Sequence, residues 1–174
     1  MNINKKKIGV LGGTFDPAHK GHLKISIEAR KRFKLNKIIW AVTKKNPFKK
    51  KTFFNLKKRI NIAKKITFKN KYIEVCFFES RIKSNRTVKL INYLEKKYNN
   101  TNIYLIMGAD NLINFHRWMH WKKILIKCKL LVFDRHSYKD KSLKSITFKR
   151  YNKKYVHFVK FKKVNISSSK LKEI

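Results

Sequence analysis

Residues 7–22 read KIGVLGGTFDPAHKGH, and this stretch decides the fold class. The apolar run Ile8–Leu11 is typical of a short buried strand, and Gly12 and Gly13 follow it directly. Turn residues come next, and apolar residues at helical spacing begin after Gly21. A strand, a glycine loop and a helix in this order predict the first unit of a parallel α/β sheet.

The rest of the chain repeats this alternation. We expect strands at Lys7–Leu11, Lys37–Val42, Tyr72–Phe78, Ile103–Met107, Leu130–Phe133 and Tyr155–Phe161. We expect helices at Gly21–Phe33, Asn55–Phe68, Thr87–Tyr98, Asn111–Phe115 and Trp118–Lys127, with a further helix starting at Ser167. Lys139–Lys154 is basic and weakly patterned, and we expect a mobile surface segment there. The pattern predicts an α/β, Rossmann-like, doubly wound and mainly parallel sheet with helices on both faces, in one domain spanning residues 1–174.

Unusual residues follow several of the expected strands. They are Gly12–Gly13, Thr43–Lys49, Gly108–Asp110, which we expect to be a loop, and Asn165–Ser169. The carboxyl ends of parallel strands meet at one edge of the sheet, and ligands bind there. The sequence therefore predicts a ligand site built from these segments.

The net charge is +37, from 46 Lys and Arg against 9 Asp and Glu. Such a charge attracts anionic substrates and, non-specifically, nucleic acid. The basic residues are spread through the whole chain, and Lys, Asn, Ile and Phe are abundant together, which is the bias of an AT-rich coding sequence. We therefore expect no specific nucleic-acid partner.

Other global features point to an ordinary globular protein. Hydrophobic residues make up 43% of the chain, and we find no uncharged apolar stretch of the roughly 18 residues that a membrane helix needs. The apolar run near the start is too short for a signal peptide, so we expect a cytoplasmic protein. Cys76 and Cys128 have no metal-binding spacing and are expected to be buried reduced thiols.

The loop after the first strand has the chemistry of a phosphate site. Glycines let the backbone come close to a ligand. His19 and His22 lie at the start of a helix, where exposed N–H groups and the helix dipole favour an anion. We find no Ser–His type of nucleophile–base pair, which favours direct transfer over a covalent intermediate. Asp16 is expected to be structural and to tie the turn.

The stretch Gly12–His22 resembles the GGTFDPxHxGH signature of the nicotinate mononucleotide adenylyltransferases, within the HxGH nucleotidyltransferases, and matches each fixed letter. The resemblance implies a single nucleotidyltransferase domain that transfers the adenylyl group of ATP to nicotinate mononucleotide. The products would be nicotinate adenine dinucleotide and pyrophosphate. It implies ATP and phosphate binding by Gly12, Gly13, Thr14, Phe15, His19 and His22, with both histidines catalytic.

Met107–Leu112, followed by Phe115 and Trp118, is similar to the family's second block. The resemblance implies that Asp110 contacts the ribose and that Trp118 stacks on the nicotinate ring, with Met119 beside it. For Trp121 we favour a place in the core.

Two further segments match, in part, the segments with which the family binds the nicotinate nucleotide. Thr87 matches a threonine near the nicotinate carboxylate, while Arg86 and Leu90 replace a tyrosine and a second threonine. An arginine here could pair with the carboxylate instead. Residues 46–49 stand in the place of the family's Pro-Pro-His-Lys loop, and Lys49 is retained as a nicotinate-nucleotide ligand.

Residues 166–172, ISSSKLK, resemble the second hallmark, ISSTxIR. This implies that Ser167, Ser168 and Ser169 bind the ATP phosphates and that Lys172, in place of arginine, is catalytic and clamps the triphosphate. We expect Mg²⁺ to bind with ATP rather than in a carboxylate cage of the protein, so no protein metal site is expected.

Three alternatives remain open. Another member of the superfamily could use phosphopantetheine or a cytidine nucleotide, although the former usually has threonine where His19 stands. The same reaction could use nicotinamide mononucleotide. A basic nucleic-acid-binding protein is the alternative of another class, and it rests on the charge and on 13% aromatic residues without a recognised motif.

Overall fold

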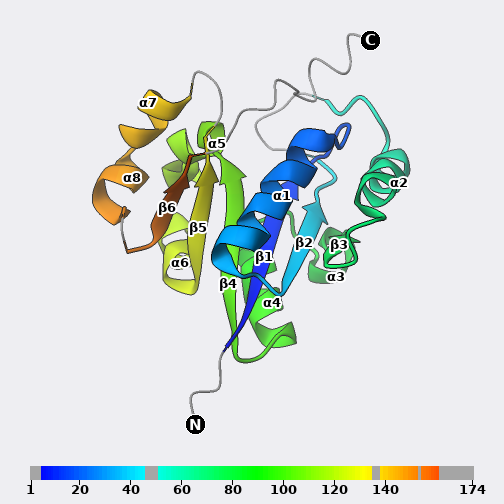
Figure 1. Ribbon diagram of the computed structural model, residues 1–174, viewed down its shortest axis with the longest axis horizontal. Helices are drawn as coiled ribbons and strands as arrows, with labels where there is room; N and C mark the ends of the chain where they lie inside the picture. Colours follow the sequence, from blue (N-terminus) through cyan, green and yellow to red (C-terminus); the bar gives the residue numbers. More distant parts are fainter. Residues whose placement is uncertain (1–4, 46–50, 135–137, 153, 161–174) are drawn as a thin grey trace.

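The computed structural model describes residues 5–45, 51–134, 138–152 and 154–160. The described strands form one parallel sheet in the order β3-β2-β1-β4-β5-β6 (Figure 1). They are β1 (Lys6–Gly13), β2 (Lys37–Val42), β3 (Ile73–Cys76), β4 (Thr101–Gly108), β5 (Cys128–Phe133) and β6 (Val156–Val159). The chain starts at the centre, builds one half outward and then crosses to β4. This order confirms the doubly wound prediction and puts the topological switch between β1 and β4.

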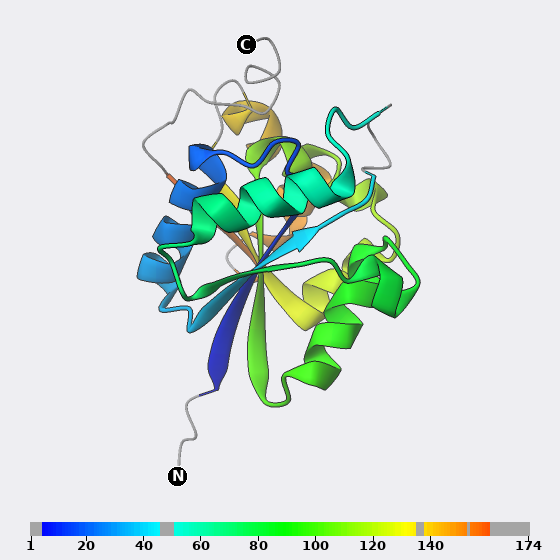
Figure 2. The same ribbon diagram turned by 90° about the vertical axis from the view of Figure 1, so that its right-hand side faces the viewer.

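Helices cover both faces of the sheet, as the two views show (Figures 1 and 2). They are α1 (Lys20–Phe33), α2 (Leu56–Thr67), α3 (Glu79–Ile82), α4 (Thr87–Lys97), α5 (Ala109–Ile113), α6 (Trp121–Lys127), α7 (Lys139–Leu143) and α8 (Ile146–Tyr151), with a 3₁₀ turn, η1 (Phe115–Arg117). One apolar cluster packs α1 and α2 on the sheet, and a second packs α4, α5 and α6 on the other face.

The central strands are apolar almost throughout because each is covered on both sides. In β1, Ile8 and Val10 belong to the α4 side, and Leu11 belongs to the α1 side. Gly9 lies between them, where a Cβ atom would come within 2.9 Å of the Cδ1 atoms of Ile106 and Leu35. Continuous buried strands of this kind are typical of parallel sheets.

Two predictions of local structure are wrong. Gly108–Asp110 is not a loop: Gly108 pairs with Phe133 at the end of β4, and α5 begins at the next residue. The region 139–154 holds two short helices, α7 and α8, rather than an unstructured segment. These helices bury small polar side chains, Ser142 and Thr147, so they lack the apolar stripe by which a helix is recognised.

The cysteines differ in burial. Cys128 is buried as expected, whereas Cys76 is only partly buried, and both are free thiols. Burial raises the pKa of each thiol to about 12, so neither is a reactive thiolate at neutral pH. The helix expected at Ser167 lies outside the described residues. Within the described part of the chain, no helix is long and apolar enough to span a membrane.

Candidate active site

A cavity of about 400 Å³ opens at the carboxyl edge of the sheet, on the face that α4 covers. Two sets of residues line it. One, here called the glycine wall, consists of Gly12 and Gly13 at the end of β1 with Thr43 and Lys45 after β2. The other, here called the tryptophan wall, consists of Arg86, Thr87 and Leu90 at the start of α4 with Arg117, Trp118 and Met119 after η1. The cavity therefore lies where the sheet order predicts a ligand.

The glycine wall presents backbone to the cavity. A Cβ atom placed on Gly12 would meet no protein atom within 4 Å, so the space beside it is open to a ligand. Gly13 also lines the cavity, and its carbonyl accepts the Thr43 N–H at 2.9 Å. This hydrogen bond joins the two segments of the wall.

His19 and His22 lie at the start of α1 with ring centroids 3.9 Å apart. Nδ1 of His19 accepts the Gly21 N–H at 3.1 Å, and Nδ1 of His22 accepts the His19 N–H at 3.3 Å. The two rings thus form a capping box of the kind that Ser and Glu usually form. A nitrogen that accepts a hydrogen bond carries no proton, so each neutral ring carries its proton on Nε2. Both imidazoles therefore have an Nε2–H donor, which suits phosphate oxygens.

A buried aromatic stack supports the second histidine. The Phe15 ring is 2% exposed and lies parallel to Trp40, with centroids 4.8 Å apart. It also contacts the His22 ring at 4.9 Å. Trp40 Nε1 donates to Ser26 Oγ at 2.8 Å, which fixes the indole against α1. The Phe15 side chain is therefore part of the core.

Asp16 has a structural role, as predicted, although what it ties is the start of α2. Its buried carboxylate accepts the N–H groups of Phe53 and Phe54, at 2.6 and 2.8 Å. Sequence reasoning missed Arg59 on α2, which is 1% exposed and donates to the carbonyl of Thr14. A signal was available, since Arg59 stands on the apolar stripe of a helix.

Within the tryptophan wall, Trp118 packs against an aromatic ring of the core. Trp118 is partly buried, and its ring lies 5.1 Å from that of Phe115, a core residue. Met119 is 46% exposed beside it, and Thr87 is the first residue of α4. The cavity thus brings together three of the four residues that the resemblance places around the nicotinate nucleotide, the fourth being Lys49.

The other predicted site residues fall elsewhere. Phe15, His19 and His22 of the signature loop are not among the described residues that line the cavity. Thr14 follows the glycine wall and is tied to α2 through its carbonyl. Asp110 is in the first turn of α5, and its neighbour Asn111 lines the cavity. Lys49, Ser167, Ser168, Ser169 and Lys172 lie outside the described residues.

The charge balance of the cavity suits an anionic ligand. Among the described residues that line it, Lys45, Arg86 and Arg117 are basic and Glu79 is the only acid. Burial raises the pKa of the Glu79 carboxyl above its ordinary value, although the Lys44 N–H and the charge of Arg59 act in the opposite direction. The described part of the chain contains no group of three or more His, Cys, Asp or Glu that could hold a metal ion.

Comparisons with known proteins show which family the chain belongs to. The cytidylyltransferase-like family model matches residues 10–174. A protein of Pelagibacter ubique (strain HTCC1062), named "Probable nicotinate-nucleotide adenylyltransferase", is 59% identical over 176 residues, which cover 100% of this chain and 96% of the relative. A protein of the same name from Ruegeria sp. (strain TM1040) is 38% identical over 118 residues, or 68% of this chain and 62% of the relative.

A solved structure has the same fold. It is the nicotinic acid mononucleotide adenylyltransferase of Plasmodium falciparum complexed with NaAD, and it superposes with a TM-score of 0.76 over 97% of this chain and 83% of that one, at 19% identity. At this identity the likeness shows the fold alone. The family follows from the sequence matches, which span most of this chain and nearly all of the Pelagibacter relative. The chain therefore belongs to the cytidylyltransferase-like family and, within it, to the nicotinate-nucleotide adenylyltransferases.

Proposed function

We propose that this protein transfers the adenylyl group of ATP to nicotinate mononucleotide, giving nicotinate adenine dinucleotide and pyrophosphate. The observation that carries the proposal is one cavity that joins Gly12 and Gly13 of the signature loop to Thr87 and Trp118. The first pair would accept the phosphates and the second pair the pyridine ring. The names of the relatives, and the NaAD in the Plasmodium falciparum complex, support the same substrates.

The reaction needs positioning and charge stabilisation more than covalent help. A phosphate oxygen of nicotinate mononucleotide attacks the α-phosphorus of ATP, and the bond from that phosphorus to the oxygen bridging to the β-phosphate breaks in line. The Nε2–H donors of His19 and His22 would bind phosphate oxygens. We assign to His22 the stabilisation of the negative charge that grows on the α-phosphate in the transition state.

The far end of the triphosphate would be held by Ser167, Ser168, Ser169 and Lys172, and this assignment rests on the resemblance of their segment alone. The described residues offer no acidic cage for Mg²⁺. We propose that Mg²⁺ arrives bound to ATP, where it would neutralise phosphate charge.

On the tryptophan wall, Trp118 would stack on the nicotinate ring, with Met119 beside it and Thr87 near the carboxylate. Arg86 and Arg117 both line this side of the cavity, and a guanidinium is well suited to pair with a carboxylate. This pairing favours nicotinate over nicotinamide, whose amide carries no charge. Asp110 would contact the ribose and Lys49 the nicotinate nucleotide, again on the resemblance.

The test is pyrophosphate release by the purified protein with ATP and Mg²⁺. Nicotinate mononucleotide, nicotinamide mononucleotide and phosphopantetheine are supplied in separate reactions. We expect fast release with the first and at least about tenfold lower kcat/KM with the second, the effect of losing one charge-assisted pair. Release with phosphopantetheine alone would overturn the substrate, and release with none of the three would overturn the reaction.

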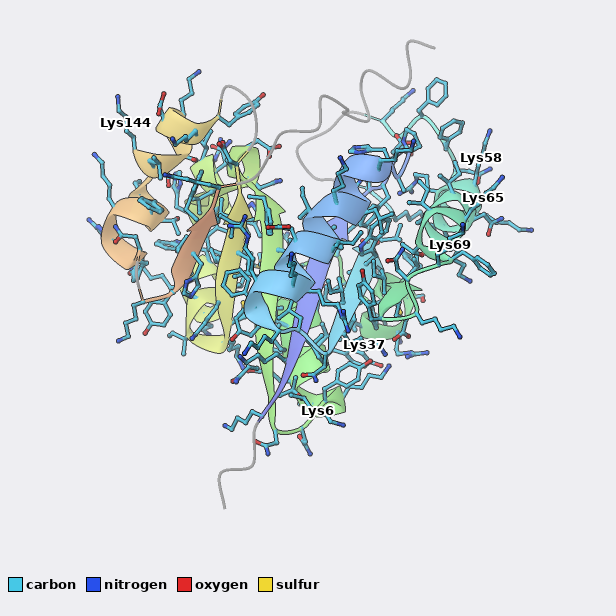
Figure 3. All side chains as sticks on the ribbon, in the orientation of Figure 1. Lys6, Lys37, Lys58, Lys65, Lys69 and Lys144 are labelled. Atoms are coloured by element: carbon cyan, nitrogen blue, oxygen red, sulfur yellow. The ribbon has the colours of Figure 1, made fainter. Side chains whose placement is uncertain are left out.

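The nucleic-acid alternative has little support in the arrangement of charge. The labelled lysines lie on opposite sides of the molecule, with Lys144 at one flank, Lys58, Lys65 and Lys69 at the other, and Lys6 at the lower edge (Figure 3). Specific binding would need the basic residues gathered on one face. A steep salt dependence of binding without turnover would favour this alternative.

A further inference from the structure

A buried arginine connects the two segments of the glycine wall. Arg59 is on α2, outside the cavity, and its guanidinium donates to the carbonyls of Thr14 at 2.5 Å, Thr43 at 2.7 Å and Lys44 at 2.9 Å. Its Nε donates to the Phe54 carbonyl at 3.1 Å. One side chain thus holds the loop after β1, the segment after β2 and the segment that leads into α2.

The peptide units of Lys44 are held from both sides. Its carbonyl accepts from Arg59, and its N–H donates to Glu79 Oε1 at 3.1 Å. The residues on either side of it, Thr43 and Lys45, both line the cavity. The orientation of this segment toward the cavity is therefore fixed by Arg59 and Glu79, which both form hydrogen bonds with the backbone of Lys44.

The environment of Arg59 requires an arginine rather than any cation. Its four bonds run to four carbonyls in different directions, which a planar fork of five N–H groups can reach and a single ammonium cannot. Burial lowers the pKa of the guanidinium, while the charges of Asp16 and Glu79 act in the opposite direction. The chain has eight arginines among its 46 basic residues, so an arginine is not the default cation of this sequence.

We propose that Arg59 is a positioning residue for adenylyl transfer, holding the loop of Gly12–Thr14 and the segment of Thr43–Lys45 at the separation that the triphosphate needs. The proposal rests on the proposed function, because it assigns the glycine wall to ATP. Arg59 itself does not touch the substrate. Its loss moves the wall, and a displacement of about 1 Å is enough to lower turnover by about 100-fold.

The test compares R59K and R59A with R32K, whose arginine is exposed on α1 and pairs with Glu28. Each variant is assayed below its own melting temperature, as measured by circular dichroism. We expect R59K to lower kcat/KM for ATP by about 10- to 100-fold while KM for nicotinate mononucleotide stays within about twofold, and R32K to behave as wild type. Free guanidinium at millimolar concentration should restore part of the activity of R59A.

If R59A does not fold, variants of Glu79 and the folded R59K variant still test the proposal. Glu79→Ala removes the acceptor of the Lys44 N–H, whereas Glu79→Gln keeps one, so only the alanine variant should raise KM for ATP. A folded R59K with wild-type kcat and KM for ATP would overturn the proposal and leave Arg59 a purely structural residue. Absence of turnover in the wild type would instead refute the proposed function, and ATP affinity measured by calorimetry on the same variants would still report on positioning.

Discussion

The two walls of the cavity are built in different ways. The glycine wall is held through its backbone, since the Gly13 carbonyl accepts the Thr43 N–H and the Thr43 carbonyl accepts from the buried Arg59. In the tryptophan wall, Trp118 is placed by the packing of its ring on Phe115, and the Met119 side chain is partly open to solvent. Glycines at the end of a strand let a ligand approach the backbone closely, which suits the phosphate chemistry that the reaction always involves. A side-chain wall can change its specificity by substitution without disturbing the loops that carry the phosphates.

The largest expected effect comes from removing the imidazole of His22. His22→Ala should lower kcat by at least about 100-fold, because it removes a donor to the transition-state phosphate. His22 also accepts the His19 N–H in the capping box, so alanine weakens the helix start as well.

His22→Gln separates these two roles. Glutamine is a usual capping-box partner, so this variant keeps the cap and loses only the imidazole. We expect its melting temperature to match the wild type and its kcat to fall as far as that of His22→Ala, measured by pyrophosphate release. His120→Asn is the control, since His120 is exposed and has a positive φ that asparagine tolerates. Near-normal turnover in folded His22→Gln would refute the catalytic assignment.

The sequence predicted the parts of the molecule whose physical cause is local. Strands buried on both faces are recognisable as apolar runs, and the signature 12–22 names the loop, its histidines and the helix that follows. Asp16 was correctly expected to be structural, but its partners, the Phe53 and Phe54 N–H groups, are distant in sequence and could not be predicted from the turn. The boundaries of the strands differ from prediction by a few residues only.

What the sequence did not predict depends on contacts between distant segments. Arg59 binds carbonyls at positions 14, 43, 44 and 54, and carbonyls have no sequence signature. Its place on the apolar stripe of α2, with Ile60 and Ala63, was the only local sign. The helices α7 and α8 were missed because they bury small polar side chains. The sequence predicts a loop at the start of α5 because Gly108 ends β4 with no connecting turn.

The next effect concerns substrate choice at the tryptophan wall. Arg86→Ala and Arg117→Ala should each raise KM for nicotinate mononucleotide by about tenfold, the loss expected for a charge-assisted pair, and leave KM for ATP near the wild-type value. The measurement is the ratio of kcat/KM for nicotinate and nicotinamide mononucleotide. Arg81→Ala is the control, because Arg81 is exposed on α3 and bonds only the Tyr93 hydroxyl among the contacts described. An unchanged ratio in both variants would show that neither arginine reads the carboxylate.

Two glycines of β1 offer a smaller and more symmetrical contrast. Gly12→Ala should raise KM for ATP by up to about tenfold without loss of stability, because its methyl group enters the open cavity. Gly9→Ala should leave KM for ATP unchanged and lower the free energy of unfolding by about 1–3 kcal/mol. Its methyl group would lie 2.9 Å from the Cδ1 atoms of Ile106 and Leu35. Thermal melts and ATP kinetics on the two variants test both halves. A Gly12→Ala enzyme with normal KM would place ATP away from this strand end.

The smallest effect is expected at the opposite edge of the sheet, where charge serves stability alone. Lys37 begins β2 and pairs with Glu74 of β3, and both side chains are partly exposed (Figure 3). The hydrogen bond from Lys37 lowers the pKa of Glu74, and the bond to Glu74 raises the pKa of Lys37. A lowered carboxyl pKa in the folded state stabilises the protein above the unfolded-state value of Glu74, and this stabilisation disappears as the pH falls through the folded-state pKa. A raised lysine pKa in the folded state stabilises the protein below the unfolded-state pKa of Lys37, and this stabilisation disappears as the pH rises through the folded-state pKa.

Glu74→Gln should therefore melt slightly below the wild type between about pH 5 and pH 10, and the two melting temperatures should converge in stronger acid and stronger base. Its KM for ATP should not change, and a change would mean that this pair, at the far ends of the strands, also positions the cavity.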